Sequence, residues 1–292
     1  MYGYQTSTSS AGAAVVIHNG ADNVWMLANT AHSSNIGMIT TQSTETYFIG
    51  NLIYNIHHPA GSSWDPNSGY SSGVGIHFRN GGTTGGAIHN TLYAYDTGMQ
   101  LTQGGAAGYD IENNIFSERS ESTGWDIRVG ESDVASGSTF DYNLIYNSTS
   151  AARISWNSST ANDVAQFKSA TGKCSNCPAE ADPNFVNPAI GNFRLNDPSA
   201  AKDVGVAHSI YASFTSRYGI DIMQDIVGNP RTLGAATEIG AFEFVAPIAP
   251  PTNPSAILLP WQIFLHYGAP LRSLRWQFVL ITVTVLITVT VY

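Results

Sequence analysis

The stretch Ile76-His-Phe-Arg-Asn-Gly81 returns as Met99-Gln-Leu-Thr-Gln-Gly104 and again as Trp125-Asp-Ile-Arg-Val-Gly130. Each copy alternates apolar and polar residues, as a strand with one buried face does. Each copy also ends at a glycine, which can turn the chain with positive φ. The repeat therefore predicts a series of equivalent strands whose apolar residues fill an interior. These residues are Ile76, Phe78, Met99, Leu101, Trp125 and Ile127.

A second repeat, an asparagine followed by apolar residues, lies downstream of each strand. Its copies are Asn23-Val-Trp-Met, Asn51-Leu-Ile-Tyr, Asn114-Ile-Phe and Asn143-Leu-Ile-Tyr, with Asn90-Thr-Leu-Tyr as a degenerate copy in which Thr91 is in register. Asparagine tolerates left-handed backbone and bonds neighbouring backbone groups. Stacked asparagines are expected to bond from one copy to the next, which is a structural role.

The spacing of the repeats decides the fold class. The copies begin 23 and 26 residues apart without a helix between them, which is too short for a βαβ unit of about 30 residues or a propeller blade of about 40. We therefore predict an all-β chain folded as a right-handed parallel β-helix of five or six coils. Its coils span about 15–157 and a closing segment spans 158–245, with a short helix over 163–170 capped by Asn162.

The two ends of the chain carry separate expectations. Residues 1–7 lack the basic and apolar stretches of a signal peptide, and the coils start so early that we expect the N-terminal cap of the β-helix to be missing. Residues 246–256 form a proline-rich linker and 257–292 a hydrophobic tail. The uncharged segment 276–292 is open to three interpretations: a membrane anchor that contacts a bilayer, an added segment, or a final strand.

Composition excludes several classes of protein. Charged residues make up 11%, the net charge is −9 and all acidic residues precede Pro247. Such an acidic domain without a basic stripe is a poor nucleic-acid binder. The two cysteines, Cys174 and Cys177, have no second ligand pair for zinc, so we expect a small loop disulfide or two free thiols.

A series of short motifs follows the coils: Asp182-Pro-Asn-Phe-Val, Gly191-Asn-Phe-Arg-Leu, Asp203-Val-Gly205, Asp225-Ile-Val-Gly-Asn-Pro-Arg231 and Glu238-Ile-Gly-Ala-Phe-Glu243. In this order and spacing, the sequence resembles secreted bacterial β-helix proteins of the pectate-lyase-like superfamily over about residues 15–244. The resemblance implies a parallel β-helix, an extracellular or cell-surface location, and binding or cleavage of a polysaccharide. It does not imply one activity, because one fold hosts many functions.

Aligning the repeats by their closing glycines places polar residues in two rows on the outer face. The first row is predicted to hold His77, Gln100, Asp126 and Arg153, and the second Arg79, Thr102, Arg128 and Ser155. Adjacent coils lie about 4.8 Å apart, so Arg79 and Arg128, two coils apart, could reach one ligand. An insertion over 57–70 adds two aromatic residues, Trp64 and Tyr70, which could stack on sugar rings or fold back on the coils.

This face suits an acidic sugar. Lyases break a uronate chain by β-elimination, with a base that removes a proton and a cation that stabilises the enolate. We expect Arg79, Arg128 and His77 to carry this chemistry, Gln100, Trp64, Tyr70 and Arg153 to bind substrate, and Asp126 with Glu131 to hold calcium. The absence of lysine before Lys168 weakens this prediction, because the superfamily often uses a lysine or arginine base.

Two alternatives stay open. A glycoside hydrolase needs a pair of carboxylates across the bond, and only Asp126 lies in the predicted rows. A non-catalytic surface or adhesion protein would use the same coils as a rigid spacer. The tandem His57-His58 could bind a metal, but adjacent side chains point opposite ways in an extended segment. The leading hypothesis is an extracellular protein that binds, and cleaves by elimination, an acidic polysaccharide.

Overall fold

The structure is a computed structural model that describes residues 12–18, 20–69, 72–79, 84–102, 108–157 and 159–246, together with two short strands near the C-terminus. The chain divides into two compact units, 1–244 and 245–292. In the second unit, strands β20 (Arg275–Val279) and β21 (Leu286–Thr290) pair antiparallel. No helix in the described part of the chain is long and apolar enough to cross a bilayer.

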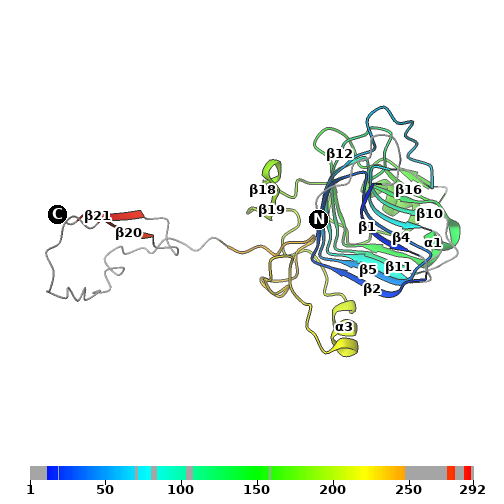
Figure 1. Ribbon diagram of the computed structural model, residues 1–292. Coiled ribbons are helices and arrows are strands. Elements are labelled where there is room, and N and C mark those ends of the chain that lie inside the picture. Colours follow the sequence, from blue (N-terminus) through cyan, green and yellow to red (C-terminus); the bar gives the residue numbers. More distant parts are fainter. Residues whose placement is uncertain are drawn as a thin grey trace. The chain divides into compact units, whose positions relative to one another are not determined.

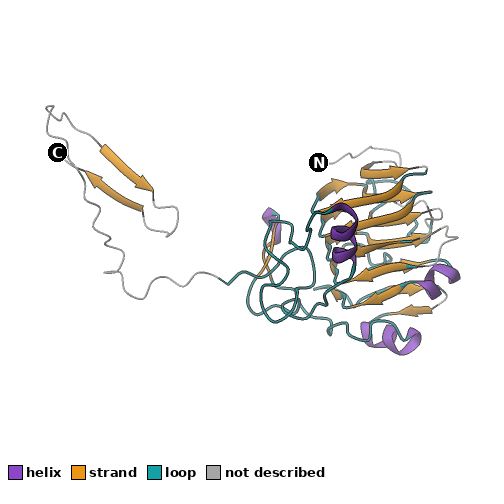
Figure 2. Cartoon of the chain, turned by 90° about the horizontal axis from the view of Figure 1, so that it is seen from below, coloured by secondary structure: helices purple, strands orange, loops and turns teal. Residues whose placement is uncertain are grey.

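The first unit is built from three parallel sheets, in each of which a strand pairs with the strand three places along the chain. This order is that of a parallel β-helix, so the predicted fold class is confirmed. Five coils contribute a strand to all three sheets and β16 begins a sixth. In Figure 1 the labelled strands of sheet A (β1, β4, β10 and β16) run side by side, and Figure 2 shows the strands stacked coil upon coil.

The strands have the following bounds. Sheet A holds β1 (Ala13–His18), β4 (Ile36–Thr41), β7 (Val74–Arg79), β10 (Thr97–Thr102), β13 (Ile127–Val129), β16 (Ile154–Trp156) and the antiparallel β17 (Ser159–Ala161). Sheet B holds β2 (Asp22–Leu27), β5 (Thr44–Ile49), β8 (Gly85–Ile88), β11 (Tyr109–Glu112) and β14 (Thr139–Asp141). Sheet C holds β3 (Thr30–Ser34), β6 (Leu52–Ile56), β9 (Thr91–Tyr95), β12 (Ile115–Arg119) and β15 (Leu144–Tyr146).

The interior of the coils is a continuous apolar column. In sheet A the register stacks Met38, Ile76, Met99, Ile127 and Ile154, each fully buried on the next. Similar columns rise from the inner faces of sheets B and C, and together they form one core. Because strands alternate inward and outward positions, each coil buries its apolar residues only when its neighbours stack on it.

An asparagine ladder closes each coil between sheets B and C. Asn51, Asn90, Asn114 and Asn143 each accept on Oδ1 from the backbone nitrogen and the Nδ2 of the asparagine one coil earlier, at 2.9–3.2 Å, with Asn29 as the first donor. The predicted coil-to-coil bonding is confirmed. Two details were wrong: Asn90, not Thr91, is in register, and Asn23 lies outside the ladder.

The closing segment has two parts: the helix α2 (Val164–Thr171) packs Phe167 against Phe140 and Trp156 of the last coils. The part after it, which contains the motif series, packs against sheets B and C. The segment also holds the helix α3 (Ile210–Tyr218), with η1 (Pro188–Ile190) and the hairpin of β18 (Phe185–Asn187) and β19 (Asn192–Leu195) between the two helices. The cap of α2 is Asp163, one residue after the predicted Asn162, because the Asp163 side chain accepts from Gln166 N. Cys174 and Cys177 form the expected disulfide.

The charged residues of the last two motifs are buried and hold this segment together. Arg231 is fully buried, where its Nη1 donates to Glu243 Oε1 at 3.0 Å and to the carbonyl of Gly240. The Asp225 carboxylate accepts from three donors within its own turn and from the Glu243 backbone. Buried charges are tolerated only when they are paired and bonded, so these motif residues serve the fold.

Candidate functional site

The outer face of sheet A carries one row of residues that differ from coil to coil. Across β4, β7, β10, β13 and β16 the register aligns Ile39, His77, Gln100, Arg128 and Ser155. Arg128 therefore lies beside Gln100, not beside Thr102 as predicted, and the predicted register is wrong by two residues from β13 onward. Asp126 and Arg153 do not belong to this row.

The error came from using Gly130 as an equivalent of the earlier closing glycines. Gly81 and Gly104 lie outside the described residues, but β13 ends at Val129 and is followed by the helix α1 (Ser132–Gly137) before β14 begins. A strand that leads into a helix does not need the same turn as one that leads into another strand. A shift by two keeps the same face outward, which is why Arg128 is still an outer residue.

The insertion between β6 and β7 folds back over this outer face. Gln100 Nε2 donates to the carbonyl of Ser68 at 2.9 Å, and Arg128 Nη2 donates to the carbonyl of Asn67 at 2.8 Å. Trp125, which was expected inside the coil, instead lies outside it and donates from Nε1 to Asn67 Oδ1 at 3.3 Å. We call residues 57–69 the covering loop.

His77 lies at the centre of this face and is fully buried. Its Nε2 is 2.9 Å from Thr102 Oγ1. Burial, and then the nearby guanidinium groups of Arg79 and Arg128, lower the pKa of His77 to about 3. His77 is thus neutral at physiological pH and a weak base, which disfavours the predicted role in proton abstraction. Because the charges of Arg79 and Arg128 both lower the pKa of His77, both guanidinium groups lie near this imidazole.

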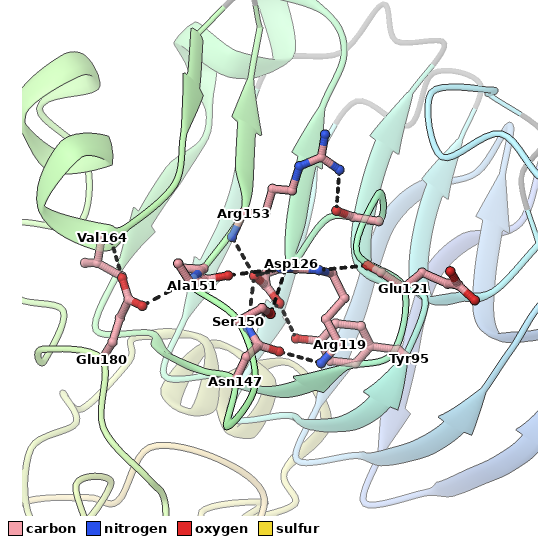
Figure 3. Close-up of polar contacts among 12 residues, drawn as sticks. Tyr95, Arg119, Glu121, Asp126, Asn147, Ser150, Ala151, Arg153, Val164 and Glu180 are labelled. Atoms are coloured by element: carbon pink, nitrogen blue, oxygen red, sulfur yellow. Dashed lines mark hydrogen bonds and ion pairs between the residues drawn. The ribbon is translucent and has the colours of Figure 1, made fainter.

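Asp126 is a structural residue rather than an outer calcium ligand. It is fully buried, pairs with Arg119 Nη1 at 2.5 Å, and accepts from Tyr95, Asn147 and the backbone of Arg153, as Figure 3 shows. Burial raises the pKa of Asp126, while Arg119 opposes the rise. A cation beside a carboxylate that is already paired with a buried guanidinium is unfavourable, so Asp126 does not fit calcium.

The other predicted partners also lie elsewhere. Glu131 precedes α1, and its charge acts on Arg128. The Arg153 guanidinium stacks 3.9 Å above the Trp125 ring and donates to the carbonyls of Thr123 and Gly124. Both residues border the row without joining it.

The aromatic residues of the covering loop were predicted either to stack on sugars or to fold the loop back. Trp64 is half-buried, donates from Nε1 to the carbonyl of Ser72 at 2.8 Å and stacks on His58 with ring centroids 5.0 Å apart. These contacts favour the role in folding the loop. Tyr70 lies outside the described residues.

Four titratable side chains meet where the covering loop leaves sheet C. Both imidazoles of the tandem pair bond the same carboxylate: His57 Nδ1 lies 2.9 Å from Asp96 Oδ1 and His58 Nδ1 lies 2.7 Å from Asp96 Oδ2. The expectation that the two histidines point opposite ways was wrong, because the chain leaves its strand at Ile56 and is no longer extended. Glu121 joins Asp96 and His58 from the next coil. The sequence signalled only the histidines.

A second cluster of titratable side chains lies at the outer face of sheet B, and the sequence analysis missed it too. His208 Nε2 lies 3.8 Å from Asp110 Oδ2 and 3.7 Å from Glu112 Oε2. Burial, and then the charges of Asp110 and Asp141, raise the pKa of Glu112 to about 7. Glu112 and Asp141 face each other on adjacent strands. The sequence rows covered sheet A alone and therefore could not bring these acids together.

The surface also has a small hollow of about 160 Å³ outside sheet C, lined by Tyr93, Ser117, Glu118 and residues of the segment 182–188. It contains none of the predicted residues and is smaller than the several hundred Å³ of typical ligand pockets.

Comparisons with protein-family models, curated proteins and solved structures gave no match for this chain.

Proposed function

We propose that this protein is an extracellular carbohydrate-binding β-helix that holds an acidic polysaccharide on the outer face of sheet A. The observation that carries the proposal is the state of Arg128. Its Nη2 bonds one loop carbonyl, while its Nη1 is buried and has no hydrogen-bond partner among the described residues. An unsatisfied donor on a charged group is costly, and a carboxylate ligand would satisfy it.

The position of Arg79 supports the same ligand. Arg79 aligns with Thr102 and Arg128 with Gln100, so the arginines are two coils apart and offset by two residues along the strands. Strand geometry then places their Cα atoms roughly 12 Å apart. Two fixed cations at this separation suit a polymer with repeated carboxylates, and they provide local positive charge in an otherwise acidic domain.

Access to this face requires the covering loop to give way. Its bond to Arg128 is solvent-exposed, and because the donor is charged its loss would cost up to about 1.5–3 kcal/mol, so a ligand has to replace it. A uronate carboxylate can replace the Asn67 carbonyl as the partner of Arg128 with a gain in charge complementarity. The loop then lines the glycan instead of the protein surface.

Cleavage by β-elimination is the catalytic form of this proposal. Arg79 or Arg128 would hold the carboxylate and stabilise the enolate, and the other arginine would serve as the base, because His77 is a weak one. Calcium held through Glu131, and membrane contact through 276–292, are secondary parts of the proposal.

A panel of uronate polymers tests the proposal, with binding measured by calorimetry and elimination by absorbance of the unsaturated product. Arg128→Ala is expected to weaken binding about 10- to 150-fold, the loss of one charge-assisted contact. Arg194→Ala, an exposed arginine on β19, is the matched control and should bind like the parent. If no polymer binds with or without calcium, the spacer or adhesion role is favoured.

Glycoside hydrolysis is a second candidate, favoured by the carboxylates of sheet B. A carboxyl group with a pKa of about 7 near other acids is what a general acid at neutral pH requires. The same panel, assayed for reducing ends without unsaturated product, tests this activity. Glu112→Gln should abolish it and leave binding at Arg128 unchanged.

A further inference from the structure

The group at the base of the covering loop has the composition and spacing of a metal site. One ring nitrogen of His58 and one carboxylate oxygen each of Asp96 and Glu121 all lie within 4.8 Å of one another. Three ligand atoms bound tetrahedrally to one ion at about 2.0–2.2 Å are about 3.3–3.6 Å apart, so small side-chain rotations would bring these three atoms onto one ion. The three residues come from the loop, from the β9–β10 turn and from the turn after β12, so the fold brings them together.

Glycine residues leave room for Asp96 on two sides. A side chain at Gly73, which has φ +76°, would collide with the Asp96 carboxylate, and a side chain at Gly124 would collide with the Asp96 backbone carbonyl. Glycine at these two positions allows the loop and the turn 121–124 to approach Asp96 closely. Asp96 is itself almost fully buried.

Neighbouring residues hold the side chains of His58 and Asp96 and the turn at Glu121 in place. His57 Nδ1 bonds Asp96 Oδ1 at 2.9 Å, on the oxygen that does not face His58. The Trp64 ring, stacked on His58 with an angle of 10° between the planes, fixes the imidazole plane. Arg119 Nε donates to the Glu121 carbonyl and holds that turn. Partners of this kind surround the ligands of protein metal sites.

The Glu121 carboxylate supplies an independent observation. In the part of the chain that the structure describes, no hydrogen bond or ion pair to this carboxylate is present, although it lies close to the Asp96 carboxylate. Two carboxylates at this distance repel each other unless a cation or proton lies between them. A divalent ion would remove the repulsion.

We propose that His58, Asp96 and Glu121 bind a divalent transition-metal ion of the Zn²⁺ or Mn²⁺ type. One imidazole with two carboxylates suits these ions better than calcium, which prefers an all-oxygen shell. Solvent completes the coordination. The ion would tie the covering loop to the coils through His58. The proposal is independent of glycan binding.

Calorimetric titration of the chelator-treated full-length protein with Zn²⁺, Mn²⁺ and Ca²⁺ tests this site. We expect saturable binding of one Zn²⁺ or Mn²⁺ per chain, weaker binding of Ca²⁺, and a metal-dependent rise in melting temperature. Co²⁺ should give the visible absorption bands of a bound ion. His57→Gln, which removes an outer partner, should weaken binding about 10- to 100-fold.

His58→Gln and Glu121→Gln should weaken binding more than His57→Gln, and Glu121→Gln is the safer variant because no described residue bonds its carboxylate. Two matched controls, Glu118→Gln on β12 and His208→Gln in the closing segment, should bind like the parent. The proposal is overturned if the folded parent binds no ion at saturation, if Glu121→Gln binds like the parent, or if the binding is lost in His208→Gln instead.

Discussion

The inside of the coils and the outer face of sheet A follow opposite rules. Inside, each coil repeats its predecessor: the apolar column and the ladder of Asn51, Asn90, Asn114 and Asn143 place the same kind of residue at the same height. Outside, the aligned row changes from Ile39 to His77, Gln100, Arg128 and Ser155. Repetition inside follows from stacking, because each coil must satisfy its neighbour's buried groups.

The difference separates residues that hold the coils from residues that are available for a ligand. A residue inside the coils is stabilising only when the next coil supplies a matching partner. A residue on the outer face contacts solvent or the covering loop instead. We therefore expect substitutions inside to change stability and substitutions outside to change binding, and the variants below test where this division fails.

The largest effect is expected for Asp126→Ala. Asp126 is not repeated and was predicted on the outer face, yet it is fully buried against Arg119. Its removal leaves a buried guanidinium without a counter-ion, which costs about 3–5 kcal/mol. Urea unfolding should show this loss, and Asp22→Ala, an exposed acid on β2, should be nearly neutral. A loss below about 1 kcal/mol would place Asp126 with the outer residues.

The next effect concerns the ladder. In Asn114→Ala the backbone nitrogen and side chain of Asn90 lose their acceptor, and the carbonyl of Ala87 loses a donor. Each of these three neutral hydrogen bonds contributes about 0.5–1.5 kcal/mol, so a net loss of about 1.5–4.5 kcal/mol is expected. Asn162→Ala, an exposed asparagine outside the ladder, is the control. Equal stability of the two variants would contradict a cooperative ladder.

The sequence predicted the inside well because stacking imposes a period that can be read from it. The number of coils and most of the asparagine ladder and of the inner columns follow from the two repeats, although Trp125 was predicted inside and lies outside. The outer face was predicted less well. Gly130 leads into α1 rather than into a strand-to-strand turn, so the alignment slipped by two residues and misplaced Arg128, Asp126 and Arg153.

The groups that the sequence missed share a physical cause. His58, Asp96 and Glu121 lie in connections between strands, whose lengths differ from coil to coil, and Asp110 meets His208 through the closing segment. No repeat constrains such residues, so only the folded chain brings them together. The tandem histidines were visible, but their common acceptor Asp96 was not.

A pH-dependent effect is expected from Glu112 on the outer face of sheet B. Its folded pKa of about 7 lies above the ordinary 4.5, so the native state holds the extra proton between these values. The contribution of Glu112 to stability should therefore fall as pH rises from about 4.5 to 7, by about 1–3 kcal/mol after allowance for partial exposure. In Glu112→Gln the loss of stability between pH 5 and pH 8 should be smaller by this amount, which urea unfolding at the two pH values would show. An unchanged pH profile in the variant would mean that another group titrates.

The smallest effect on stability is expected at Gln100, an outer residue that is buried under the covering loop and therefore tests the division between inner and outer residues most directly. Gln100 lies on the outer face but is covered, and its Nε2 bonds the carbonyl of Ser68 at 2.9 Å. Gln100→Ala should cost no more than about 1.5 kcal/mol, because the covering loop can admit water in place of the side chain. Hydrogen exchange should instead rise in the covering loop while the strands β7 and β10 stay protected. Ser155→Ala is the matched control, because Ser155 lies in the same row and makes no side-chain bond to the described residues of the covering loop, and it should leave exchange unchanged. Faster exchange in β10 as well would show that this outer residue helps to hold the coils, and that the outer face of sheet A is part of the fold rather than a surface kept for a ligand.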